Sequence, residues 1–181
     1  MMKAKVACTA LLVGLLVAAP ATAGIVVSID PAYQQVNIAL GTTTVDIVAD
    51  ISLDCAIVQW GLDLGLIGTS VSINNVAINE VAFDAVFAPD GDDLAAIVPI
   101  ADIPLSGNGI LLATVTFNLD AEGLTDLALS DTPGDDNEGF FLYPSGYCTE
   151  LTYVDGAINV VPEPAALALL VLCGLAIRRR R

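Results

Sequence analysis

The sequence contains no histidine, and its six lysine and arginine residues all lie near the two ends of the chain. They are Lys3, Lys5 and Arg178 to Arg181, so the segment 24–161 has no cationic side chain. A Ser-His-Asp or Cys-His catalytic arrangement, a Schiff-base lysine and an arginine clamp are therefore excluded from that segment. Only carboxylate chemistry stays open, as in the paired acids of a glycosidase, and the sequence locates no such pair. We therefore expect a protein that is not an enzyme.

Acidic residues, in contrast, are concentrated in the segment that lacks cations. Glu163 is the only one of the 21 Asp and Glu residues that lies outside 24–161. Nucleic acid and anionic lipid would be repelled, because binding them needs Lys or Arg at the phosphates, so we expect no nucleic-acid partner. Cations would be attracted. A solubilising or salt-adapted surface and a specific ion site are the two explanations of this charge.

The N-terminus has the pattern of a signal peptide. Two lysines precede an apolar run over residues 6–19, and Pro20 ends this run before the small residues Ala21, Thr22 and Ala23. Charge, a short apolar core and small residues in this order are typical of a leader removed by signal peptidase. The alternative, a permanent N-terminal anchor, needs a longer core. We expect residues 1–23 to be the signal peptide, with a cut after Ala21 as the second choice.

Few cysteines remain once the two ends are set aside. Cys8 lies in the expected leader and Cys173 in an apolar run near the C-terminus, which leaves only Cys55 and Cys148 in the segment 24–161. An exported domain with two cysteines predicts a disulfide between them. Such a bridge would stabilise the domain by about 4–5 kcal/mol in the chain-entropy model. No CxxC or Cys/His group indicates a metal site.

The segment 24–161 is rich in the alternating pattern of β-strands. The pattern is clearest over 110–119, where Ala113, Val115, Phe117 and Leu119 face one way. Turn residues separate such runs, and Asp155-Gly156 predicts a type I′ hairpin. Many short strands with frequent turns predict an all-β fold, a two-sheet β-sandwich over 24–161. The expected strands cover 25–29, 35–40, 45–52, 57–64, 71–78, 81–87, 94–100, 110–119, 124–129, 139–143, 147–154 and 157–161.

Two acidic turns are weak candidates for a calcium site, the only cofactor that the sequence suggests. Oxygen ligands crowded on a glycine-containing loop suit calcium, but neither turn has the spacing of an EF-hand. Two solvated turns of a generally acidic protein are the alternative. The candidate ligands are Asp90, Asp92 and Asp93 in the first turn and Asp131, Asp135, Asp136, Asn137 and Glu138 in the second.

Exposed aromatic side chains are the candidates for carbohydrate binding. Tyr143 and Tyr147 flank the turn Pro144-Ser145-Gly146, where we expect both rings to be exposed. Trp60 lies inside the apolar run 57–64, so we expect it in the core rather than on a sugar-binding surface.

The chain ends with the segment "VPEPAALALLVLCGLAIRRRR". A helix over the apolar residues 165–177 would span about 20 Å, against about 30 Å for the hydrocarbon core of a bilayer. We expect one short transmembrane helix, with the arginines on the cytoplasmic side and an extended backbone around Glu163 outside. The residues of this pattern are Pro162, Glu163, Pro164, Arg178, Arg179, Arg180 and Arg181.

This ending resembles the PEP-CTERM sorting signal, here over residues 162–181. Proteins with that signal are substrates of exosortase, a transpeptidase-like membrane enzyme of Gram-negative bacteria that make extracellular polysaccharide. The resemblance implies export across the inner membrane, a transient anchor there, and a cut near Glu163. It also implies a final location at the cell surface or in the biofilm matrix.

The body resembles the cohesin-like and carbohydrate-binding-module-like β-sandwiches of bacterial surfaces. The resemblance is carried by "SIDPAYQQVNIALGTTTVDIVADI", "IVQWGLDLGL", "GILLATVTFNLDAEGLTDLALSD" and "YVDGAINVV". It implies a jelly-roll sandwich and, since cohesins bind dockerin domains through one sheet face, possible binding of a dockerin-like protein. No residue here matches a defined dockerin-contact motif. The resemblance therefore implies an adhesive, structural or protein-binding role, and the alternative is a module that binds extracellular polysaccharide.

Added salt should stabilise the exported domain, because screening weakens the repulsion between its uncompensated carboxylates. We expect the melting temperature to rise from low to high ionic strength, with a further rise on addition of a divalent cation. Thermal unfolding followed by circular dichroism in increasing NaCl measures this. A melting temperature that does not change with salt would contradict the prediction.

Overall fold

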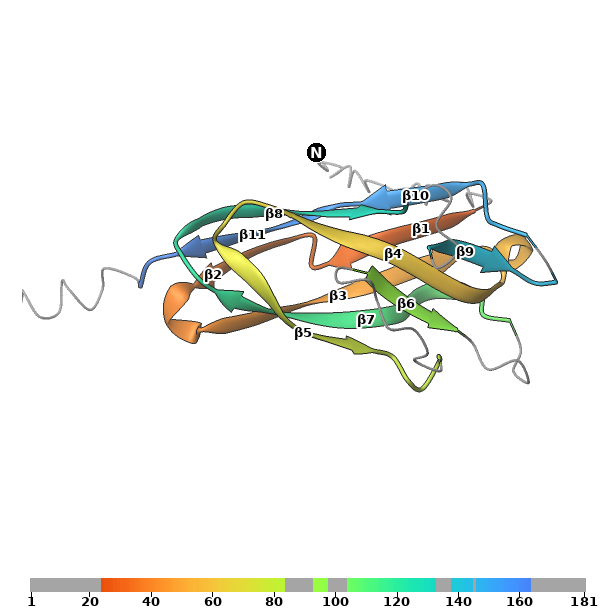
Figure 1. Cartoon of the computed structure of the whole chain (residues 1–181), viewed down its shortest axis with the longest axis horizontal. Coiled ribbons are helices and arrows are strands. Elements are labelled where there is room, and N and C mark those ends of the chain that lie inside the picture. Colours follow the sequence, from red (N-terminus) through yellow and green to blue (C-terminus); the bar gives the residue numbers. More distant parts are fainter. Residues whose placement is uncertain (1–23, 84–92, 98–103, 133–137, 145, 164–181) are drawn as a thin grey trace, which may run out of the picture.

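A computed structural model describes residues 24–83, 93–97, 104–132, 138–144 and 146–163 of the chain. The described residues form a sandwich of two β-sheets, which confirms the predicted fold class (Figure 1). Among these residues, no helix is long and apolar enough to cross a membrane. The expected leader, 1–23, and the expected C-terminal helix, 165–177, lie outside the described residues.

Each sheet combines strands from both halves of the chain. Sheet A has the order β10-β1-β3-β7-β5, and sheet B has the order β2-β11-β8-β4-β6, with β9 also paired to β4. Two short 3₁₀ turns, η1 (Ile38–Leu40) and η2 (Leu53–Cys55), lie at opposite ends of β3. The strands are β1 (Ile25–Asp30), β2 (Tyr33–Asn37), β3 (Thr42–Ile51), β4 (Ile57–Ile67), β5 (Val71–Ile78), β6 (Asp93–Ile97), β7 (Gly107–Leu119), β8 (Gly123–Ser130), β9 (Gly139–Leu142), β10 (Leu151–Val154) and β11 (Gly156–Val161).

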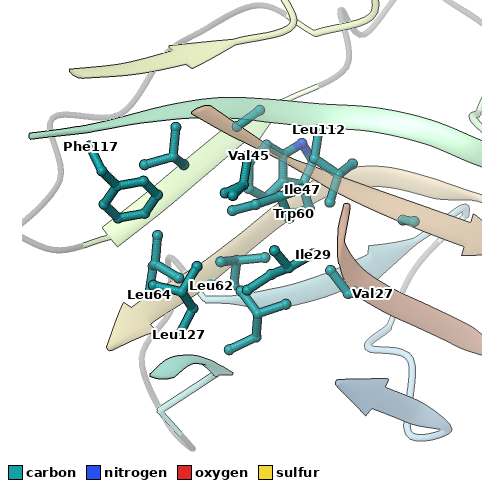
Figure 2. Packing of buried hydrophobic residues seen from close by; sticks show 14 of the residues in the cluster. Val27, Ile29, Val45, Ile47, Trp60, Leu62, Leu64, Leu112, Phe117 and Leu127 are labelled. Carbon is teal, nitrogen blue, oxygen red and sulfur yellow. The ribbon is translucent and has the colours of Figure 1, made fainter. Parts of the chain in front are cut away.

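The core lies between the two sheets and follows the alternation of the sequence. Val45 and Phe117 of sheet A face Leu64 and Leu127 of sheet B (Figure 2). Trp60 is completely buried and packs edge-on against Phe83, with ring centroids 5.8 Å apart. The expectation that Trp60 belongs to the core is therefore confirmed.

Two of the places where the chain changes sheets lie side by side. It passes from β1 in sheet A to β2 in sheet B through residues 31–32, and from β10 in sheet A to β11 in sheet B at Asp155. β1 pairs with β10 in parallel, and β2 pairs with β11 in parallel. Across this crossing the Ala157 N–H donates to the Ala32 carbonyl at 2.9 Å.

The hairpin predicted around Asp155-Gly156 is therefore wrong. The two strands it was to join belong to different sheets, and Gly156 does not have a positive φ. Asp155 has another role, since its Oδ1 accepts a hydrogen bond from the Leu129 N–H at 2.9 Å. Gly156 is buried directly against Ile29. Gly156 lets two chain segments pack closely against each other, and it does not form a tight turn.

The strand predicted over 81–87 is wrong where the structure describes it. Residues 81–83 form a turn that Asn79 organises. The Asn79 carbonyl accepts hydrogen bonds from the N–H groups of Ala82 and Phe83 at 3.1 and 3.0 Å, and its side-chain amide donates to the Leu111 carbonyl at 3.0 Å. The turn leaves Val81 exposed and directs Phe83 into the core. Local hydrogen bonding by an asparagine thus overrides β-propensity.

Substitution of Gly156 by alanine should destabilise the domain by about 1–3 kcal/mol, as overpacking a tight core does. A Cβ there would lie 2.8 Å from Ile29 Cγ2 and 3.0 Å from Ile29 Cβ. Gly65→Ala in β4 is the matched control, because its Cβ would meet Ala128 at ordinary contact distances, with a closest approach of 3.7 Å. Urea unfolding of both variants measures the effect. Equal loss of stability in both would contradict this account of the sheet crossing.

Candidate binding face

The outer face of sheet A is polar, and its side chains bind one another. Thr114 Oγ1 donates to Asp46 Oδ1 at 2.6 Å, joining β7 to β3. Asn74 Nδ2 of β5 donates to Asn118 Oδ1 of β7 at 2.8 Å. The exposed large apolar residues of this sheet, Ile73 and Val154, lie on its two edge strands. The apolar side chains at the centre of this face, such as the paired Val48 and Leu111, are only partly exposed.

The outer face of sheet B instead exposes large apolar side chains close together. Tyr33 of β2, Ile67 of β4 and Leu124 of β8 have 55%, 65% and 54% of their surface exposed. Their neighbours in sequence, such as Leu66 and Thr125, point inward, which is why these three point outward. Tyr33, Ile67 and Leu124 are called the apolar patch from here on.

Strand register brings the members of the apolar patch onto one surface. Ile67 lies opposite Asp126, two residues from Leu124 on the same face of β8. Leu124 lies opposite Asn159 of β11, whose side-chain amide donates to the Tyr33 hydroxyl at 3.2 Å. This hydrogen bond fixes Tyr33 over β11. The patch thus crosses four adjacent strands, β2, β11, β8 and β4.

Sequence reasoning did not predict the apolar patch as a site. The signal was available for β8, where Leu124 occupies a position that alternates with Thr125 and Leu127. An apolar residue on both faces of a strand is an exception to the alternation that marks a half-buried strand. Tyr33 and Asn159 come from segments far apart in sequence, and only the parallel pairing of β2 with β11 joins them.

A second group of aromatic residues lies on the same face, near the start of β4. Phe141 of β9 contacts Tyr147 with ring centroids 4.2 Å apart and an interplanar angle of 47°. Gly139 leaves room for this ring, since a Cβ there would lie 3.4 Å from Tyr147 Cδ1. Tyr143 and Tyr147 are both exposed, as the sequence predicts. Tyr143, Tyr147 and Phe141 are called the aromatic patch.

The charges on this face are negative. Asp63 and Asp126 point outward from β4 and β8, between and beside the two patches. Since the whole segment 24–161 has no cationic side chain, nothing on this face neutralises them. A partner that covers the apolar patch would therefore bring cations to its rim, where opposite charges favour association.

The two-sheet arrangement is shared with solved cohesin structures. The third ScaB cohesin of R. flavefaciens, solved in complex with a group 1 dockerin, aligns over 79% of this chain and 99% of its own, with 16% identity and a TM-score of 0.57. The seventh ScaB type I cohesin of Pseudobacteroides cellulosolvens aligns over 78% and 94%, with 16% identity and a TM-score of 0.54. A non-cellulosomal cohesin of the archaeon Archaeoglobus fulgidus aligns over 81% and 96%, with 14% identity and a TM-score of 0.52.

The fold is that of a cohesin module. This confirms the fold that the sequence resemblance implied, a jelly-roll sandwich. No protein-family model matches the chain, and no curated protein is similar to it in sequence.

Described residues at the borders of the two predicted acidic turns flank Asp63 of β4. Asp93 begins β6 and lies in register with Asp63. On the other side of β4, Asp63 lies in register with Ser130 of β8, which precedes the second turn. Thr132 Oγ1 donates to Asp63 Oδ2 at 3.3 Å, and the Thr132 N–H donates to the buried Glu138 carboxylate. Sequence reasoning missed Asp63.

Much of the predicted calcium site is not described. Asp90, Asp92, Asp135, Asp136 and Asn137 lie outside the described residues. In the part of the chain that the structure describes, no three acidic or cysteine side chains could together hold a metal ion. Calcium binding stays a prediction.

Tyr153 lies beside the second acidic turn with its hydroxyl buried. This hydroxyl faces Asp131 but has no hydrogen-bond partner of normal geometry. Burial, and after it the negative charge of Asp131, Glu138 and Asp63, raise the pKa of Tyr153 well above its ordinary value. Ionisation would place a further negative charge in a buried acidic site, so the folded protein keeps this tyrosine protonated.

The two cysteines approach each other across one end of the sandwich. Cys55 of η2 and Cys148 of the β9–β10 loop are thiols with their Sγ atoms 3.4 Å apart. Burial and the neighbouring Cys55 raise the pKa of the Cys148 thiol. The structure thus brings together the residues of the predicted disulfide, and the bond itself stays a prediction.

The first residues of the predicted sorting motif are accessible. Pro162 and Glu163 follow β11 directly, and both are exposed. Pro164 and Arg178, Arg179, Arg180 and Arg181 lie outside the described residues.

Tyr153→Phe should remove a source of alkaline instability. The folded-state pKa of Tyr153 exceeds the unfolded value of about 10, so its contribution to stability is complete below about pH 10 and is lost as pH rises further. We expect the variant to match the parent within about 1 kcal/mol at pH 7, because the lost hydroxyl has no hydrogen bond. At pH 11 it should be the more stable of the two. Urea unfolding at both pH values tests this, with exposed Tyr143→Phe as control. A parent and variant that lose stability equally at pH 11 would contradict it.

Proposed function

We propose that this chain is an exported, non-enzymatic protein of the cell surface or biofilm matrix that binds another protein through the outer face of sheet B. The contrast between the two outer faces carries the proposal. Sheet A presents polar groups that bond to one another, whereas sheet B exposes Tyr33, Ile67 and Leu124 on adjacent strands. Clustered apolar surface with a tyrosine is typical of protein-binding sites.

The likeness to cohesins supports the same reading. Several of the similar cohesin structures are complexes with dockerins. The partner proposed for this chain is a dockerin-like protein in the general sense, a surface or matrix protein with an apolar centre and a cationic rim. We expect the partner's rim to be cationic because Asp63 and Asp126 on this face are negatively charged.

Replacing the apolar patch should abolish partner binding and leave the fold intact. We expect Tyr33→Ala to weaken binding about tenfold and the double variant Ile67→Asp, Leu124→Asp to weaken it further, as loss of central contacts does. The partner is found by a photo-reactive amino acid placed at Ile67 in cells, and its affinity is then measured by calorimetry. Thr116→Asp, Asn118→Asp on the outer face of sheet A is the matched control. If that control loses binding as strongly as the sheet B variants, the assignment of the face is wrong.

Polysaccharide binding is the second candidate, and the aromatic patch favours it. Exposed Tyr143 and Tyr147 offer ring faces to a sugar, and Phe141 holds one of them in place. Affinity electrophoresis in gels that contain the extracellular polysaccharide separates the two functions. Binding to the polysaccharide retards the protein in such a gel. The polysaccharide would be favoured if the double variant Tyr143→Ala, Tyr147→Ala abolishes this retardation and the Ile67→Asp, Leu124→Asp variant keeps it.

We further propose that signal peptidase and exosortase process the chain at its two ends, with the segment 165–177 as a transient anchor in the inner membrane. Exposure of Pro162 and Glu163 immediately after β11 supports an accessible cut. Mass spectrometry of the surface-located protein should show a C-terminus near Glu163 and no Arg178 to Arg181. Changing Pro162, Glu163 and Pro164 to alanine should keep the uncut chain in the membrane fraction. A surface protein that still carries the four arginines would show that the segment is a permanent anchor.

A further inference from the structure

Three chain segments meet where β1 begins, at the end of the sandwich that also holds the two cysteines. The Gly24 N–H donates to Ser52 Oγ at 3.1 Å, and the Ser52 N–H donates to the Gly24 carbonyl at 3.1 Å. The Ile25 N–H donates to the Glu150 carbonyl at 2.9 Å. Gly24 therefore lies between the segment 52–55, which ends in Cys55, and the segment 148–150, which begins with Cys148. We call these three segments the junction.

Only glycine fits at the centre of the junction. A Cβ on Gly24 would lie 2.4 Å from the Glu150 carbonyl oxygen, and Gly24 has a φ of 141°. The same Cβ position is 3.0 Å from Glu150 Cβ. The Glu150 side chain therefore starts next to Gly24.

Gly24 is buried, and a pocket lies directly beside it. An open pocket of about 330 Å³ borders Gly24 and is lined by Ile25, Val26 and residues 149–152. Glu150 is exposed at this pocket. The pocket therefore lies where the proposed cut would leave a chain end.

We infer that the junction is a binding site for the amino terminus that signal peptidase creates, in which the Gly24 ammonium is held by Ser52 Oγ and the Glu150 carboxylate. The inference rests on the proposed export. Hydrolysis breaks the Ala23–Gly24 peptide bond, with the hydroxyl of water going to the Ala23 carbonyl and a proton to the Gly24 nitrogen. The new amine takes up a further proton at neutral pH. It keeps the hydrogen bond to Ser52 and gains two N–H donors for Glu150.

This ammonium would be the only cation in the acidic body. The segment 24–161 has no Lys, Arg or His, so no other positive group competes for Glu150 there. The other titratable groups of the junction are Asp54, Cys55 and Cys148. The predicted Cys55–Cys148 bridge would join the same two segments covalently. Processing would thus supply the charge that the body's own side chains lack.

The test uses the exported protein, produced from the full chain in a Gram-negative host and purified after processing. Mass spectrometry of its N-terminal peptide identifies the first residue. The absence of lysine from the body makes the terminal amine its only amine, so the rate of acylation by an N-hydroxysuccinimide ester between pH 6 and 9 reports on that group alone. The comparison is between the parent, Glu150→Gln, Ser52→Ala and the control Glu122→Gln in the β7–β8 turn at the other end of the sandwich.

We expect Gly24 as the first residue and acylation of Glu150→Gln at pH 7 about three- to tenfold faster than the parent, since a lost carboxylate lowers the pKa of a neighbouring amine. Ser52→Ala should react faster as well, and Glu122→Gln should match the parent. A mature protein that begins at Thr22, or equal rates in the parent and Glu150→Gln, would overturn the inference. If export itself fails, a site-specific protease can instead expose the Gly24 amine in vitro. The inference then still predicts the same acylation rates, so its failure can be distinguished from failure of the proposed function.

Discussion

Apolar packing between the inner faces of the two sheets is the interaction on which this structure depends. In most domains ion pairs supplement such packing, but the segment 24–161 offers no cationic side chain to form one. Its carboxylates can only repel one another, and that repulsion opposes folding. The core must therefore be continuous, and it is, with Ile47, Trp60, Val115 and Phe117 fully buried between the sheets. Of the acidic residues whose burial the structure describes, only Glu138 is buried, beside the second acidic turn.

The paired crossings between sheets decide which residues form the candidate binding face. Because β2 joins sheet B beside β11, Tyr33 comes to lie over a strand from the other end of the chain. Had β10 and β11 formed a hairpin, β11 would lie in sheet A, and neither Tyr33 nor Asn159 would lie beside Leu124. Gly156 permits the crossing, since the main chain there passes within contact of Ile29. The close approach in the core and the exposed patch outside are thus two results of one topology.

The fold class could be predicted from the sequence because alternation reports directly on burial. Residues 113–119 of β7 have this alternation, and the structure places the apolar side chains of that stretch in the core. The sheet crossing could not be predicted, because Asp-Gly suits both a tight turn and a close approach, and only the surroundings of Gly156 distinguish them. Val81 to Phe83 has β-propensity, but the hydrogen bonds of Asn79 depend on Leu111, which is distant in sequence. The candidate face depends in the same way on long-range register, which joins Tyr33, Leu124 and Ile67 through β11 and β8.

The proposed processing sites lie at opposite ends of the sandwich. β3 begins at the end of the sandwich where the chain leaves β11, and it ends at Ile51, which pairs with Ile25 of β1. A strand of this length spans about 30 Å, so the two proposed cut sites are about that far apart. A cut after Ala23 stops short of β1, which begins at Ile25, and a cut near Glu163 falls beyond β11, which ends at Val161. Every strand would therefore survive both cuts.

While an anchor after Glu163 held the exit end at the membrane, the junction and the aromatic patch would point away from it. The apolar patch, on the flank near the exit, would be the part of the face nearest the membrane, where lipid head groups limit access to a large partner. Release near Glu163 would then do more than free the chain, because it would also open the face proposed to bind.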